Sequence, residues 1–161
     1  MQAIILAAGM GKRLGALTRN NTKCMIQVNG VTLIERMMRQ LDRLSPSLEK
    51  IVIVTGYEGE KLKTFVSRLD ISTPVEYVDN PLYASTNNIY SLYLAKEHLL
   101  QDHTLLFESD LILEDSVIDA LLRHPYPSLA LVAKLESWME GTVGPLDAVD
   151  NITQIIPRSK I

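Results

Sequence analysis

Several features that would mark a secreted, membrane-bound or zinc-binding protein are scarce in this sequence. Its single cysteine, Cys24, excludes an internal disulfide and suits a reducing compartment, so we expect a cytoplasmic location. No apolar run approaches the roughly 20 residues of a membrane span, and the first apolar segment is shorter than that of a signal peptide. The three histidines are scattered, without the spacing of a zinc site or a catalytic triad.

An excess of charge of one sign is also missing. The net charge is −3, so no general field attracts nucleic acid or an anionic membrane, and we expect neither as a partner. An anionic ligand would have to be bound by local groups. The hydrophobic fraction of 47% and the charged fraction of 22% are those of an ordinary globular protein, and 161 residues suit one domain.

What the sequence does contain is a regular alternation of strand and helix patterns. We expect strands at 3–7, 50–54, 75–78, 104–107 and 128–133, and a closing hairpin at 142–149 and 152–156. We expect helices at 33–44, opened by a capping box of Thr32 and Glu35, at 58–69 and 89–100, and a last one through 122, capped by Asp115 or Ser116. Residues 24–28 should be extended and 29–30 a turn. This order predicts an α/β fold, a Rossmann-like three-layer sandwich around a mixed, mostly parallel sheet, with ligands at the carboxyl ends of its strands.

The loop after the first strand is rich in glycine. Its glycines, Gly9 and Gly11, allow backbone N–H groups to approach phosphates closely. The basic residues Lys12 and Arg13 add positive charge. A dinucleotide fingerprint would need a third glycine where Leu14 stands, and a P-loop would need Ser or Thr in place of Arg13, so both are excluded. The glycine pair alone indicates a tight turn with exposed basic residues as readily as an anion site.

An ordered series of motifs surrounds this loop: LAAGMGKRL at residues 6–14, then Thr18, Lys23, VNG at 28–30 and LIE at 33–35. This series resembles the opening of the sugar-nucleotidyltransferase superfamily. Further motifs are KC at 23–24, YASTNNIYSL at 83–92, ESD at 108–110 and ESW at 136–138. With these, the chain looks most like the phosphocholine and 2-aminoethylphosphonate cytidylyltransferases within the superfamily. Thr22 departs from the family, which usually has proline before the lysine, and we expect this change to loosen the loop that carries Lys23.

The resemblance implies transfer of CMP from CTP to a small phosphorylated acceptor, with release of pyrophosphate and with Mg²⁺ as the cofactor. Such a site must align two anions and neutralise their charge. Arg13 is expected to hold the β- and γ-phosphates, and Lys23 the α-phosphate and the attacking oxygen of the acceptor. Asp110 is expected to hold Mg²⁺. Glu108, which shares a face with Asp110 if the strand persists, either joins the metal or positions the ribose or a water.

The resemblance also assigns nucleotide binding to the first loop, through Leu6, Ala7, Ala8, Gly9 and Gly11. Ser85 and Asn87 are expected to face the edge of the base, although Asn87 suits a helix cap equally well. The ammonium group of the acceptor is expected over Trp138 with Glu140 nearby, while packing is the alternative for a lone tryptophan. The family's second metal carboxylate comes from a C-terminal region that we do not find, so we expect residues 1–161 to be a nucleotidyltransferase domain lacking its C-terminal part.

Two other hypotheses stay open at this point. A hexose-1-phosphate nucleotidyltransferase using UTP, dTTP or GTP would keep the mechanism and change the substrates. A nucleotide-binding regulatory module without turnover would explain the missing carboxylate, but has less need for Arg13, Lys23 and Asp110 together. The sequence also leaves open a homodimer and an enzyme domain fused downstream.

Overall fold

The computed structural model describes residues 1–126 and 128–130, which fall into two units, Met1–Ile112 and Leu113–Ile161. The first unit carries the sheet and the loops predicted to bind the nucleotide. In the described part of the second, one helix is present, α5 (Asp115–Arg123). No helix among the described residues is both long enough and apolar enough to cross a membrane.

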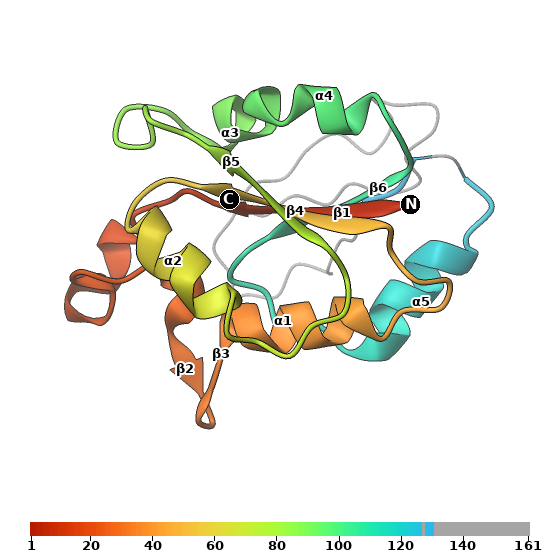
Figure 1. Cartoon of the computed structure of the whole chain (residues 1–161), viewed down its shortest axis with the longest axis horizontal. Coiled ribbons are helices and arrows are strands. Elements are labelled where there is room, and N and C mark those ends of the chain that lie inside the picture. The colour runs from red at the N-terminus through yellow and green to blue at the C-terminus, as the bar shows by residue number, and fades with distance from the viewer. Residues whose placement is uncertain (127, 131–161) are drawn as a thin grey trace, which may run out of the picture. The chain divides into compact units, whose positions relative to one another are not determined.

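The first unit is built on a parallel four-stranded sheet (Figure 1). Its strands are β1 (Gln2–Ala7), β4 (Lys50–Thr55), β5 (Val75–Asp79) and β6 (Thr104–Glu108), in the order β5-β4-β1-β6. β1 lies between β4 and β6, so Ile4 pairs with Val52 on one side and with Leu106 on the other. Because the four strands of this sheet run the same way, their carboxyl ends meet at one edge of the sheet. Of the strand expected at 128–133, residues 128–130 are not in a strand and the others lie outside the described residues.

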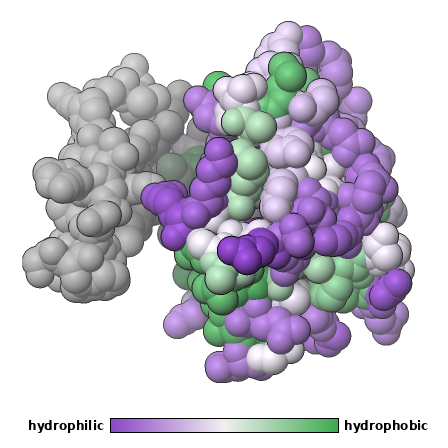
Figure 2. Space-filling model, turned by 90° about the vertical axis from the view of Figure 1, so that its left-hand side faces the viewer, coloured by the Kyte–Doolittle hydropathy of each residue, from purple (hydrophilic) through white to green (hydrophobic). Residues whose placement is uncertain are grey.

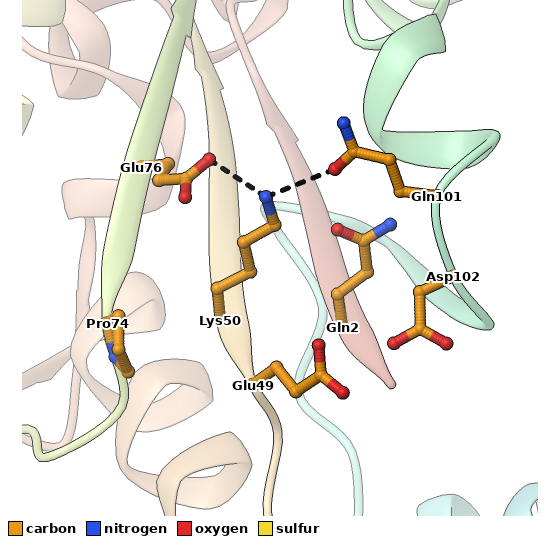
Figure 3. Close-up of a pocket in the computed structure, with 7 residues that line it drawn as sticks. All are labelled: Gln2, Glu49, Lys50, Pro74, Glu76, Gln101 and Asp102. Atoms are coloured by element: carbon orange, nitrogen blue, oxygen red, sulfur yellow. Dashed lines mark hydrogen bonds and ion pairs between the residues drawn. The ribbon is translucent and has the colours of Figure 1, made fainter.

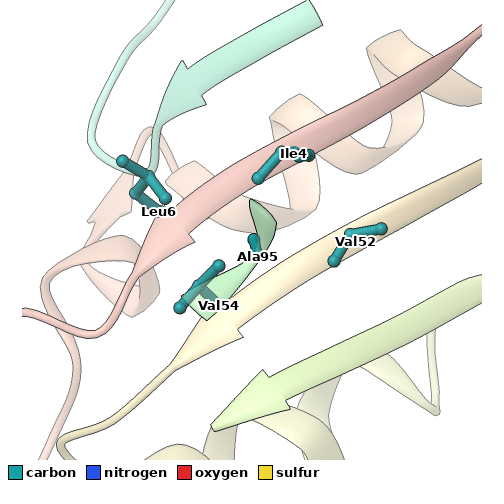
Figure 4. Close-up of a cluster of buried hydrophobic side chains, with 5 residues drawn as sticks. All are labelled: Ile4, Leu6, Val52, Val54 and Ala95. Atoms are coloured by element: carbon teal, nitrogen blue, oxygen red, sulfur yellow. The ribbon is translucent and has the colours of Figure 1, made fainter. Parts of the chain in front are cut away.

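The two central strands are apolar on both faces because helices cover the sheet on both sides. Every residue of β1 is buried, as are residues 51–55 of β4. On one face, the side chains of Ile4, Leu6, Val52 and Val54 pack with Ala95 (Figure 4). Burial of one aliphatic side chain contributes roughly 1.5–3 kcal/mol, so this cluster fixes the strands from which the site loops start.

Helices form the outer two layers, as the sequence predicted (Figure 1). α1 (Leu33–Asp42) and α2 (Gly59–Val66) lie on one face, and α3 (Asn88–Leu94) and α4 (Lys96–Leu99) lie on the other. The predicted capping box opens α1, because Thr32 Oγ1 accepts a hydrogen bond from Glu35 N at 3.1 Å. The expected three-layer α/β architecture is confirmed for this unit.

Short elements connect β1 to α1. They are two 3₁₀ segments, η1 (Lys12–Thr18) and η2 (Lys23–Met25), followed by a small antiparallel hairpin of β2 (Gln27–Val28) and β3 (Val31–Thr32). The hairpin turns at Asn29 and Gly30, whose φ angles are 52° and 78°. Asparagine and glycine tolerate such angles best, which is why the turn was predictable.

Several expected boundaries are wrong, among them the ends of the helices expected over 58–69 and 33–44, which stop at Val66 and Asp42. The helix expected over 89–100 is divided at Ala95, whose φ of −89° and ψ of 11° leave the helical region. The segment expected to be extended over 24–28 begins as η2, and only Gln27–Val28 is strand. The cap of α5 is Glu114 rather than Asp115 or Ser116, and no side-chain hydrogen bond closes it.

Candidate active site

The loops that follow the strands lie on the side of the molecule seen in Figure 2, which is on the left in Figure 1. Hydrophilic residues, in purple, cover most of the described surface there, with hydrophobic residues between them. A surface of this kind suits a charged, hydrated ligand.

Gly11 fixes the path of the loop after β1. Its φ is +61°, and a β-carbon there would lie 2.8 Å from Thr18 Cγ2 and 3.3 Å from Lys23 Cβ. The Thr18 hydroxyl donates to the Gly11 carbonyl oxygen at 3.0 Å, and Leu14 N donates to the same oxygen at 2.9 Å. Only glycine combines this φ with this close packing. The loop is therefore held in one shape, with its backbone against the stem of Lys23.

Lys23 and Asp110 form an ion pair between Nζ and Oδ2. Lys23 begins η2, and Asp110 lies in the turn directly after β6. Their side chains are 34% and 29% exposed, so a ligand can reach both while partial burial strengthens their field. The structure thus brings together two of the three residues expected to be catalytic.

Arg13, the third, lies on η1 and is exposed, as is Lys12. Within the described part of the chain, the side chain of Arg13 forms no ion pair or hydrogen bond. An exposed guanidinium group retains all its donors for phosphate oxygens. Its role in binding the β- and γ-phosphates stays a prediction.

Asn80 organises the loop after β5. It is buried, and its N–H donates to the Thr55 carbonyl oxygen at 2.7 Å. Its side-chain Nδ2 donates to Thr86 Oγ1 and Ser91 Oγ, both at 3.1 Å. Its Oδ1 accepts from Leu82 N at 2.9 Å. One amide therefore ties the end of the sheet to the loop and to α3.

The loop held by Asn80 carries the residues expected at the edge of the base. Ser85 and Asn87 are both exposed. Asn87 Oδ1 accepts from Tyr90 N at 3.4 Å, so its interpretation as the cap of α3 is confirmed. The next residue, Asn88, donates from Nδ2 to Glu108 Oε1 at 2.8 Å. β6 ends at Glu108, so the alternation that would place this side chain on one face with Asp110 does not apply.

Cys24 is buried directly behind the ion pair. Its sulfur is hydrogen-bonded to the Thr22 hydroxyl, with Oγ1 and Sγ 3.1 Å apart. Burial raises the pKa of the thiol to about 11, against the hydrogen bonds with Thr22 and Ser109, which lower it. The thiol is therefore protonated at neutral pH and takes part as a hydrogen-bonding group.

A cavity elsewhere in this unit lies at the opposite edge of the sheet, where the strands begin (Figure 3). It is lined by Gln2, Glu49, Lys50, Pro74, Glu76, Gln101 and Asp102. Its central cation, Lys50, donates to Glu76 Oε2 at 3.1 Å and to Gln101 Oε1 at 3.5 Å. Lys50 pairs with Glu76, and the carboxylates of Glu49 and Asp102 pair with the N-terminal ammonium group. Because these charges have partners and ligands of parallel sheets bind at the other edge, this cavity is not the candidate site.

The model of the MobA-like NTP transferase domain matches residues 3–154. The chain belongs to this family. It is 37% identical to the 2-aminoethylphosphonate cytidylyltransferase of Lancefieldella rimae over 72% of this chain and 45% of that protein. It is 41% identical to the choline-phosphate cytidylyltransferase of Streptococcus pneumoniae over 65% of this chain and 43% of that protein.

A solved structure of an NTP transferase agrees with the fold. The CTP:phosphocholine cytidylyltransferase of Streptococcus pneumoniae superposes with a TM-score of 0.57 at 37% identity, covering 68% of this chain and 44% of that one. The chain spans less than half the length of each of these relatives.

The residues of this NTP transferase domain fit Mg²⁺ that is bound together with a nucleotide. Among the described residues, no three His, Cys, Asp or Glu side chains lie close enough to hold a metal ion by themselves. Asp110 offers one partly exposed carboxylate next to the loop of Gly11. Mg²⁺ commonly takes one or two carboxylates and completes its shell with phosphate oxygens and water. The donor set therefore suits a metal shared with substrate phosphates.

Other predicted residues of this NTP transferase domain are placed as follows. Ala7 and Ala8 are buried at the end of β1, and Gly9 is exposed beyond them. The side chain of Leu6 belongs to the core cluster, so only its backbone is available to a nucleobase (Figure 4). Trp138 and Glu140 lie outside the described residues.

The sequence analysis did not predict the close contact between the residues directly after β4 and the first loop. A β-carbon on Gly56 would lie 2.7 Å from the Ala8 carbonyl oxygen and 2.7 Å from Tyr83 Cβ. The next residue, Tyr57, donates its N–H to the Ala8 oxygen at 3.1 Å, and its hydroxyl accepts from Asn20 N at 3.2 Å. The rings of Tyr57 and Tyr83 are 6.1 Å apart. A glycine directly after a buried strand was the one signal of this close approach.

Proposed function

We propose that this chain catalyses the transfer of CMP from CTP to phosphocholine or 2-aminoethylphosphonate, with release of pyrophosphate. The observation that carries the proposal is the Lys23–Asp110 pair beside the Gly11 loop, at the edge where parallel sheets bind ligands. The two acceptors are those named for the bacterial relatives that share 37% and 41% identity with this chain.

The reaction is an in-line displacement at the α-phosphorus of CTP. An oxygen of the acceptor's phosphate or phosphonate forms a new bond to that phosphorus, while the bond to the bridging oxygen breaks and pyrophosphate leaves with its electrons. Both reactants are anions that repel each other, so alignment and neutralisation of charge supply the catalysis. Lys23 supplies a positive charge at the reacting phosphate, and Arg13 supplies a second one at the β- and γ-phosphates.

Asp110 would hold Mg²⁺ together with phosphate oxygens, and the ion would supply positive charge to the triphosphate. Lys23 lies beside this carboxylate and offers its own charge to the phosphate oxygens. The ion pair keeps both groups next to each other at this edge of the sheet.

Loop residues bind the other parts of the two substrates. The backbone of residues 6–9 forms the floor for the cytosine, and Ser85 and Asn87 offer polar groups at its edge. Gly11 gives the triphosphate close access to backbone N–H groups. Trp138 and Glu140 receive the ammonium group of the acceptor, through the ring face and the carboxylate.

The test is release of pyrophosphate from CTP and Mg²⁺ by the full native protein, with phosphocholine and 2-aminoethylphosphonate in parallel. We expect release with one of the two acceptors, and none from an Asp110→Asn variant that unfolds at the temperature of the unmodified protein. An active Asp110→Asn protein would contradict the metal assignment. Release only with UTP, dTTP or GTP and a hexose 1-phosphate would indicate the sugar-nucleotide activity, and CTP binding without any release would indicate a regulatory module.

A further inference from the structure

The two residues of the ion pair are attached to buried polar neighbours. Thr22 and Cys24, on either side of Lys23, are both 1% exposed. Ser109, immediately before Asp110, is 8% exposed. Buried hydroxyl and thiol groups are costly unless they are hydrogen-bonded, so their partners indicate what they hold together.

These buried groups lie close to one another on the two segments. Thr22 Oγ1 and Cys24 Sγ are 3.1 Å apart and hydrogen-bonded. Ser109 N donates to the Leu6 carbonyl oxygen at 3.3 Å, and the Ser109 side chain acts to lower the pKa of the Cys24 thiol. The buried thiol of η2, which carries Lys23, therefore lies near the turn after β6, which carries Asp110. Through Leu6, this turn is anchored on the central strand.

Thr22 retains the backbone shape of the proline that the resembling families usually have there. Its φ is −77° and its ψ is 152°, which a proline can adopt. Threonine adds two contacts that proline cannot make, since its N–H donates to Asn21 Oδ1 at 3.0 Å and its hydroxyl bonds to Cys24. The expected loosening of this loop therefore finds no support in its contacts.

The geometry points to Thr22, Cys24 and Ser109 as positioning residues that hold Lys23 opposite Asp110. This inference rests on the proposed function, because the three residues affect turnover only through the position of Lys23. A lysine side chain is long and flexible, and its charge is directed only as well as its backbone is held. Displacement of a reacting group by about 1 Å can cost roughly 100-fold in rate, so a missing hydroxyl beneath Lys23 should be visible in turnover.

The test compares Thr22→Val, which removes the hydroxyl and keeps the shape, with Thr22→Ser, which restores a hydroxyl. The matched control is Thr73→Val, which removes another buried hydroxyl, one that donates to Asp42 at 2.7 Å before β5 begins at the opposite edge. In Thr22→Val we expect kcat to fall about tenfold with the KM for CTP nearly unchanged. Thr22→Ser should restore most of kcat, and Thr73→Val should leave kcat unchanged. Ser109→Ala should behave like Thr22→Val and serves in its place if that variant does not fold.

A double-mutant cycle separates positioning from general packing. In a Lys23→Met background, Thr22→Val should cause no further loss, because the residue through which it acts is gone. An equal loss in both backgrounds, or a Thr22→Val protein with unchanged kcat, would overturn the inference.

A structural measurement keeps this test independent of the proposed function. In crystal structures without ligands, we expect the Lys23–Asp110 pair to be broken in Thr22→Val and retained in Thr73→Val. A pair retained in both variants would overturn the positioning role. Lack of turnover in the unmodified protein, with the pair broken only in Thr22→Val, would overturn the proposed function and leave the positioning role standing.

Discussion

Lys23 and Asp110 lie 87 positions apart in the chain and form an ion pair where β1 and β6 end. The pair exists because β6 runs parallel to β1 in direct register, with Leu6 opposite Glu108. The turn after Glu108 then brings Asp110 level with the loop that follows β1. Strand pairing thus places the two charged groups together, and we expect substitutions at the end of either strand to change the turnover rate.

Lys23→Met removes the charge and keeps much of the length of the side chain. We expect kcat for pyrophosphate release to fall by about 100- to 1,000-fold, the loss typical of one preorganised transition-state donor. The unfolding midpoint should hardly change, because partly exposed ion pairs contribute little to stability. Lys50→Met is the matched control, since Lys50 pairs with Glu76 at 3.1 Å at the opposite edge of the sheet. A loss confined to the KM for CTP would contradict the role of Lys23.

Three glycines of the first loop form a graded series. Gly11 has a positive φ, and a β-carbon there would also contact Thr18. Gly15 has a φ of +54°, but a β-carbon there would have no atom within 4 Å. At Gly9 a β-carbon would also have no atom within 4 Å. By urea unfolding, we expect alanine to cost roughly 2–3 kcal/mol at Gly11, about 1 kcal/mol at Gly15 and less than about 0.5 kcal/mol at Gly9. If the cytosine lies over Gly9, Gly9→Ala should still raise the KM for CTP. Equal costs at all three positions would contradict the packing at Gly11.

Asp42 predicts a pH dependence of stability. Its Oδ1 accepts from Ser72 N at 3.0 Å and from Thr73 N and Oγ1, both at 2.7 Å. Burial acts to raise the pKa of this carboxyl, but the hydrogen bonds outweigh it and lower the pKa below its usual value. A pKa that is lower in the folded state stabilises the fold above the unfolded value of about 3.9, and the contribution is lost as the pH falls through the folded value.

Asp42→Asn should therefore lower the melting temperature at pH 7, by an amount that corresponds to about 1 kcal/mol. The difference from the unmodified protein should shrink as the pH falls below about 4 and should vanish below the lowered pKa of the folded state, where the native carboxyl is neutral as well. Asp70→Asn, at an exposed position, is the control and should have little effect at either pH. A difference that stays constant from pH 7 to pH 3 would show that the charge of Asp42 is not involved.

Cys24 should resist alkylation in the folded protein. Its thiol is buried and its pKa is raised to about 11, so the reactive thiolate is scarce at pH 8. We expect iodoacetamide to react at least about 100-fold more slowly with the native protein than with the urea-unfolded one. Because the sequence has one cysteine, the modified mass reports this site alone. Equal rates in both states would mean that the region around Lys23 opens readily.

Local patterns were enough to predict the sheet. β1, β4, β5 and β6 each end within one residue of the expected ranges, because continuous apolar runs bounded by polar residues leave little choice. The division of the helix at Ala95 could not be predicted in this way. Neither glycine nor proline marks it. Ala95 itself is buried in the core cluster, whereas α4 has no buried residue.

Individual residues of the candidate site could be predicted from the sequence, but their contacts with one another could not. Lys23 and Asp110 were expected to act on different partners, and the contact between them depends on the long-range pairing of β1 with β6. The role of Asn80 was not predictable, because local sequence does not reveal which acceptors will face a buried amide. The position of Gly56 directly after a buried strand was a local signal of close packing, but only the structure shows which residues it packs against.

The loop between Asn80 and Asn88 is fastened at both ends, by the amide of Asn80 inside the fold and by the bond from Asn88 to Glu108. Between these anchors, residues 84 and 85 turn exposed side chains outwards while the backbone keeps its path. The loop thus presents two outward side chains on a fixed backbone, and these side chains can be varied in a library without redesigning the domain that displays them.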